Sequence, residues 1–114
     1  MDTKTDLISM CNRIVKEIES GEYYMDECAV REWDYPCADH YLDEALDVEY
    51  TASRDLEYLG SRVCVACGGP NIYIDTRNQK AQGYWGSDYI ERSYSSDALG
   101  LDDYLREMFE CLRG

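Results

Sequence analysis

Histidine is almost absent from this chain, and its scarcity limits the enzyme classes to which the protein could belong. His40 is the only histidine among 114 residues, so a triad or acid–base pair built on imidazole has a single possible centre. It lies close to Asp39 and Asp43 in a charge-rich stretch, which is typical of a solvated side chain. The sequence also lacks a GxxxxGK[ST] loop, a GxSxG motif and an HExxH motif. We therefore predict no catalytic residues and no cofactor.

Long apolar runs and basic residues are also scarce. No apolar stretch approaches the length of a membrane-spanning helix, and the first residues are amphipathic and charged, unlike a signal peptide. We therefore predict a cytoplasmic protein with no membrane partner. Eleven Lys and Arg face 24 Asp and Glu, which gives a net charge of −13. Such a charge repels phosphate and attracts basic proteins, so we predict a basic nucleic-acid-binding protein as partner and no direct contact with nucleic acid.

Six cysteines are present, and four residues could form a zinc site. Cys37 and His40, with Cys64 and Cys67, would give a Cys₃His ligand set. However, the valine and alanine between the last two cysteines favour a strand, in which the two thiols would point to opposite faces. A small zinc-binding adaptor is therefore the less favoured alternative.

The cysteines fit better as reduced, buried thiols. No signal peptide points to an oxidising compartment, and cysteine is one of the most commonly buried residue types. Cys11 lies on the apolar stripe of a predicted helix, and Cys111 lies close to another such stripe. We therefore predict core thiols and no bound metal.

Apolar residues at helical spacing predict two helices, over residues 4–19 and about 98–113. The stripe of the second helix consists of Leu101, Tyr104, Leu105, Met108, Phe109 and Leu112. A shorter helix is predicted near 37–46, with Leu42, Ala45 and Leu46 facing inward.

Between the helices, residues of about 46–95 predict four or five short antiparallel strands. Apolar and polar residues alternate in DVEYTA and in IYIDT, and GGPN and RNQK provide turns. We predict a single α+β domain over 1–114, in which an N-terminal helix, an acidic segment, a β-meander and a C-terminal helix follow one another and the helices pack on the sheet.

The negative charge is concentrated in residues 17–57, which contain fourteen acids and only two bases. In a helix, Asp39, Asp43 and Asp47 would share one face; in a strand, Asp47 and Glu49 would project together about 6.7 Å apart. Either spacing approximates successive phosphates on a nucleic-acid strand. The simplest alternative is an acidic face that only keeps the protein in solution. The predicted partner-binding residues are Asp26, Glu27, Glu32, Trp33, Asp34, Tyr35, Asp39, Asp43, Glu44, Asp47 and Glu49.

The run VACGGPNIYIDT, the later GYWG and the final YLREMFE resemble a group of small acidic proteins of bacterial phages and mobile elements, over residues of about 45–110. In size and acidity the chain is also similar to anti-CRISPR and anti-restriction proteins, several of which mimic nucleic acid. The resemblance implies a non-enzymatic inhibitor that occupies the nucleic-acid site of a CRISPR effector nuclease or a restriction enzyme. It supplies no active-site residues.

A structural or regulatory interaction module is the alternative function. Its binding would survive high salt and would depend on Tyr73, Tyr84 or Trp85. An exposed edge strand would also allow a homodimer.

Overall fold

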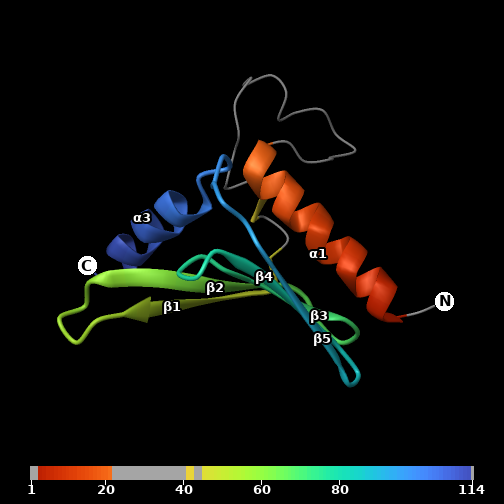
Figure 1. Ribbon diagram of the computed structural model, residues 1–114. Coiled ribbons are helices and arrows are strands. Elements are labelled where there is room, and N and C mark those ends of the chain that lie inside the picture. The colour runs from red at the N-terminus through yellow and green to blue at the C-terminus, as the bar shows by residue number, and fades with distance from the viewer. Residues whose placement is uncertain (1–2, 22–40, 43–44, 114) are drawn as a thin grey trace.

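The computed structural model describes residues 3–21, 41–42 and 45–113, and it has the expected α+β fold. Both helices lie on the same side of a five-stranded sheet (Figure 1). The predicted helix near 37–46 lies mostly outside the described residues. The elements are α1 (Thr3–Ser20), β1 (Asp47–Ala52), β2 (Tyr58–Ala66), β3 (Asn71–Asp75), β4 (Lys80–Trp85), β5 (Asp88–Ser93) and α3 (Leu101–Arg113).

The sheet is an antiparallel meander in which the spatial order of the strands, β1 to β5, equals their order along the chain. Val63 pairs with Ile74, and Ile74 pairs with Ala81 on the next strand. These three residues are buried and belong to the core between sheet and helices. The alternation that predicted the strands therefore also defines which face of the sheet is covered.

Helix α1 packs on β4 and β5 through its apolar stripe. Leu7, Cys11, Ile14 and Ile18 are buried, and the burial of Cys11, predicted from its position on the stripe, is confirmed. Burial also raises the pKa of the Cys11 thiol. The helix comes close to the sheet at Gly83, where a Cβ atom would lie 2.7 Å from Leu7 Cδ1.

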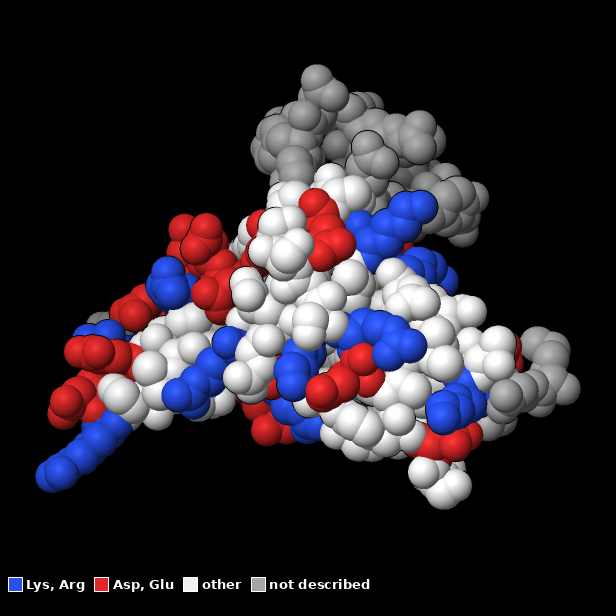
Figure 2. Space-filling model, in the orientation of Figure 1, with Lys and Arg blue, Asp and Glu red and all other residues white. Residues whose placement is uncertain are grey.

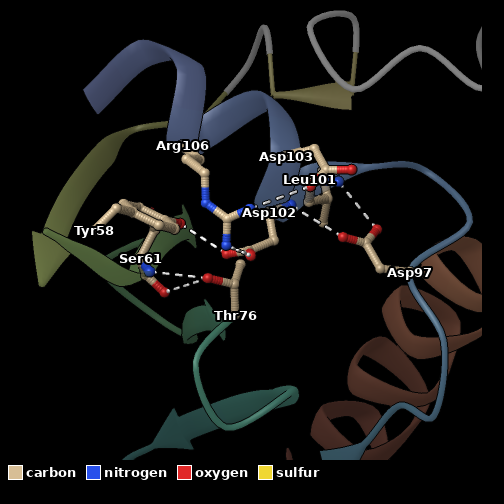
Figure 3. Close-up of polar contacts among 8 residues, drawn as sticks. All are labelled: Tyr58, Ser61, Thr76, Asp97, Leu101, Asp102, Asp103 and Arg106. Carbon is tan, nitrogen blue, oxygen red and sulfur yellow. Dashed lines mark hydrogen bonds and ion pairs between the residues drawn. The ribbon is translucent and has the colours of Figure 1, made fainter. Parts of the chain in front are cut away.

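The N-terminus of helix α3 is capped by a carboxylate that precedes the helix in the sequence. Asp97 accepts hydrogen bonds from the backbone N–H groups of Leu101 (3.0 Å) and Asp102 (3.0 Å) (Figure 3). It also accepts one from the backbone N–H of Gly100 (2.9 Å). The N–H groups of Leu101 and Asp102 have no acceptor within the helix, so one side chain satisfies both, while the Gly100 N–H also reaches the Asp97 carbonyl oxygen at 3.2 Å. Leu101 and Leu105 are then buried in the core.

A polar network joins α3 to the sheet beneath it. The Tyr58 hydroxyl donates to Asp102 Oδ1 (2.8 Å) and lies 2.7 Å from Ser61 Oγ. The Ser61 backbone N–H donates to Thr76 Oγ1 (2.8 Å), which connects β2 to the turn after β3 (Figure 3). Asp102 also pairs with Arg106 at 3.5 Å. We interpret this network as the polar contact that holds the first turns of α3 against β2.

The apolar stripe predicted for α3 is only partly covered by the sheet. Phe109 packs against the rings of Tyr50 and Tyr58, but Met108 is 41% exposed and Leu112 is 71% exposed. Cys111 is also exposed, so its prediction as a core thiol is wrong. The cause is the position of α3, whose buried residues, Leu101 and Leu105, belong to its first half.

The prediction for the residues that precede β1 is partly correct. Leu42 and Ala45 pack against the core, as expected. Leu46, also predicted to face inward, is 60% exposed. It comes directly before β1, an edge strand of the described sheet, which has a neighbouring strand, β2, on one side only.

Candidate functional site: the open face of the sheet

The face of the sheet opposite the two helices is covered by no element that the structure describes, and we call it the open face (Figure 1). Its residues alternate with the core residues along each strand. From β1 to β5 they include Asp47, Glu49, Thr51, Arg62, Cys64, Tyr73, Asp75, Lys80, Gln82, Tyr84, Tyr89, Glu91 and Ser93.

Three tyrosines form a row across the open face. Tyr84 and Tyr89 are direct partners on β4 and β5, with ring centroids 4.7 Å apart. Tyr73 on β3 meets Tyr84 edge to face at 6.1 Å. Aromatic pairs at such distances stabilise neighbouring strands, and the row presents ring surface to solvent because Tyr89 is 44% exposed.

An arginine extends this row onto β2. The Arg62 guanidinium carbon lies 3.6 Å from the centroid of the Tyr73 ring, within the range of a cation–π contact. On its other side, Arg62 is the strand partner of Glu49. The open face therefore already contains a guanidinium held by an aromatic ring next to a carboxylate-bearing strand.

At the other end of the row, Glu91 makes the polar contacts. Its carboxylate accepts hydrogen bonds from Lys80 Nζ (3.1 Å) and from the Tyr89 hydroxyl (2.6 Å). The hydrogen bond to Glu91 raises the pKa of Tyr89 to about 12. The same bond, together with Lys80, lowers the pKa of Glu91. The carboxylate thus keeps the Tyr89 phenol protonated and fixes its orientation.

Removing this carboxylate should make Tyr89 easier to ionise. We expect Glu91→Gln to lower the pKa of Tyr89 from about 12 towards the ordinary tyrosine value of about 10. The reason is that a neutral amide, unlike the carboxylate, does not favour the protonated phenol. Ultraviolet difference titration measures the change, and Tyr89→Phe identifies the residue. Since the pKa is raised in the folded state, the associated stabilisation is complete below pH 10 and is lost as the pH rises to about 12. Glu49→Gln is the control; an unchanged titration in Glu91→Gln would contradict the assignment.

Two of the predicted partner-binding acids lie on the open face. Asp47 and Glu49 alternate with Val48 and Tyr50 along β1, and both are exposed. The prediction that they project together is confirmed. The other nine predicted residues, at positions 26, 27, 32–35, 39, 43 and 44, lie outside the described residues.

The cysteines near the end of β2 differ from one another. Cys64 is buried on the open-face side of β2, and its thiol donates to the Ala66 carbonyl oxygen at 3.3 Å. Cys67 follows the strand and is exposed, so its prediction as a core thiol is wrong. A bulge between Cys64 and Ala66 disturbs the strand alternation here. Cys37 and His40 lie outside the described residues, and within 3–21, 41–42 and 45–113 no group of three or more metal-ligating side chains is assembled.

Sequence reasoning missed most of the residues that form the row. Tyr73 and Tyr84 were grouped with Trp85, but Trp85 packs against the core on the covered face. Arg62, Tyr89 and Glu91 were not singled out. Counting residues outward from the GGPN and RNQK turns would have placed Tyr73 and Tyr84 on the same face, because alternate strand residues share a face.

The described residues carry less than half of the charge excess. They include 15 acids and 10 bases, whereas the whole chain has 24 acids and 11 bases. Acidic and basic side chains are interspersed over the described surface visible in Figure 2. The concentrated negative charge therefore belongs mainly to residues 22–44.

Neither α1 nor α3, the two helices of the part that the structure describes, has the length and apolar character needed to cross a membrane. Comparison with protein-family models, with curated proteins and with solved structures found no match to this chain.

Proposed function

We propose that this chain is a non-enzymatic inhibitor of a host nucleic-acid-handling defence enzyme, either an RNA-guided nuclease or a restriction enzyme. It would act by occupying the basic surface that normally binds nucleic acid. The observation that carries the proposal is the exposed pair Asp47 and Glu49, which belongs to the acidic segment 17–57 and lies on the open face.

The geometry of this pair supports mimicry of nucleic acid. Alternate residues of a strand lie about 6.7 Å apart on one face, close to the spacing of phosphates along a nucleic-acid strand. β1 is an edge strand, so its carboxylates can approach a partner without obstruction from a further strand of the described sheet. The net charge of −13 would speed the encounter with a basic partner and make the association rate fall with salt.

Charge reversal on β1 tests the proposal. Asp47→Lys with Glu49→Lys should weaken binding to the target nuclease at least about tenfold, because attraction becomes repulsion at both positions. Adding Asp39→Lys and Asp43→Lys should abolish inhibition. The measurements are cleavage assays with a panel of RNA-guided and restriction nucleases, and titration of the inhibited enzyme at low and high salt.

The matched control reverses two exposed acids on the other side of the sheet. Glu107→Lys with Glu110→Lys, on α3, changes the net charge by the same amount, and circular dichroism checks that both double variants are folded. If the β1 variant inhibits as well as the control, the acidic surface is not the binding surface.

The tyrosine row supports a second candidate function, an interaction module whose partner is not a nucleic-acid enzyme. Aromatic side chains are enriched at the centres of protein interfaces. Binding that persists at high salt and survives reversal of Asp47 and Glu49 would favour this function over inhibition by mimicry.

A further inference from the structure

We propose that the open face is an arginine-binding surface, on which guanidinium groups of a basic partner stack on tyrosine rings beside carboxylates. This deepens the proposed function and rests on it for the kind of partner, a nucleic-acid-binding protein. The chemistry of recognition, however, comes from the open face itself.

Arg62 shows how the surface holds a guanidinium. It lies 3.6 Å from the centroid of Tyr73 and is paired across the strands with Glu49. A planar, weakly hydrated guanidinium can stack on a ring and still donate hydrogen bonds from its edge. The protein therefore provides the stacked part of such an arrangement with its own side chain, next to the strand position of a carboxylate.

Tyr84 and Tyr89 provide two further rings of the same kind as Tyr73, but without a stacked guanidinium from the described residues. They continue the row from Tyr73 at centroid distances of 6.1 and 4.7 Å. Among the described residues, none places a guanidinium or ammonium group over either ring as Arg62 does over Tyr73. The Glu91 carboxylate lies beside them and holds the Tyr89 hydroxyl at 2.6 Å. Ring and carboxylate thus occur together again on β4 and β5, two and three strands away from Arg62.

Charge selects arginine over the other groups that stack on tyrosine. Nucleobases also stack on aromatic rings, but a chain of charge −13 repels their phosphates. A lysine ammonium is compact and strongly hydrated, so it gains less from a ring than a guanidinium does. The acids and bases that flank the row make it a poor surface for a purely apolar partner.

The test compares two synthetic peptides of equal length and charge, one of alternating Arg and Gly and one of alternating Lys and Gly. Isothermal titration calorimetry with the full chain measures both affinities. We expect the arginine peptide to bind more tightly, by about two- to fivefold for each ring engaged. Both affinities should fall with salt, whereas the preference for arginine should persist.

Variants of the row locate the preference. Tyr84→Leu with Tyr89→Leu should remove it, while Tyr84→Phe with Tyr89→Phe should keep it, because only the former removes the ring faces. Tyr89→Leu alone, on an exposed position of an edge strand, replaces the double variant if that one does not fold. Leu112→Ala, which removes exposed apolar surface from α3, should leave both affinities unchanged.

The outcomes separate this inference from the proposed function. Equal affinities for the two peptides, or a preference that survives loss of both rings, would overturn the arginine surface. The proposed function would stand in that case if reversal of Asp47 and Glu49 still weakened binding to the target nuclease. Binding of a single-stranded oligonucleotide that depends on Tyr84 and Tyr89 would overturn both.

Discussion

Leu7→Ala is expected to lower the free energy of unfolding by about 2–5 kcal/mol. Leu7 is fully buried on the stripe by which α1 packs against β4 and β5. Truncation removes apolar contacts and leaves a cavity, because Gly83 beneath it has no side chain that could fill the space. Urea unfolding monitored by circular dichroism measures the loss.

The contact between Leu7 and Gly83 can be isolated with a double-mutant cycle. A Cβ at position 83 would lie 2.7 Å from Leu7 Cδ1 and 3.0 Å from Cys11 Sγ, so Gly83→Ala alone should cost about 1–3 kcal/mol through overpacking. In the Leu7→Ala background the new methyl group enters the vacated space. The double variant should therefore lose less stability than the sum of the losses in the two single variants. Strict additivity would show that α1 does not contact the sheet at Gly83.

Asp97→Ala is expected to destabilise the protein by about 1–3 kcal/mol, because the backbone N–H groups of Leu101 and Asp102 lose their acceptor at once. The Gly100 N–H loses the side-chain oxygen but keeps the Asp97 carbonyl oxygen at 3.2 Å. The loss should be largest around α3, which begins with the buried Leu101. Hydrogen exchange of the α3 amides, with thermal unfolding, measures both the local and the global effect.

Two further variants distinguish capping by Asp97 from a general effect of negative charge. Asp97→Asn keeps one carbonyl oxygen and should recover part of the stability. Asp103→Asn removes a charge from the first turn of α3, and no backbone N–H of the described residues bonds to its carboxylate, so it should cost only a few tenths of a kcal/mol through the helix dipole. An equal loss in Asp97→Ala and Asp103→Asn would mean that charge alone, rather than capping, stabilises the start of α3.

Periodicity was sufficient to predict most of the fold. Ile72 and Ile74 alternate with polar neighbours, so strand β3 and its buried face followed from the sequence, and GGPN and RNQK marked its two ends. The predicted stripe of α3 failed at Met108 and Leu112, because periodicity shows which side of a helix is apolar but not how far the partner surface extends. Cys111, also on α3, was misplaced for the same reason.

The candidate site was harder to predict, because it depends on register between strands. Arg62 and Tyr73 are eleven positions apart, and they meet only because a bulge after Cys64 and the turn at 67–70 bring them to adjacent strands. The hydrogen bond between Tyr89 and Glu91 is local and could have been suggested by their spacing of two residues. The acids Asp47 and Glu49 were found because alternation alone places them together.

The order of elements also has a consequence for synthesis in the cell. β4 and β5, on which α1 packs, begin about 60 residues after α1 ends, so at about 5–20 residues per second α1 is made several seconds before its partners. The hairpins of the sheet need no such delay, since each strand pairs with the one made just before it. Of the described elements, α1 therefore stays exposed longest on the nascent chain, and its apolar stripe is covered only when β4 and β5 have left the ribosome.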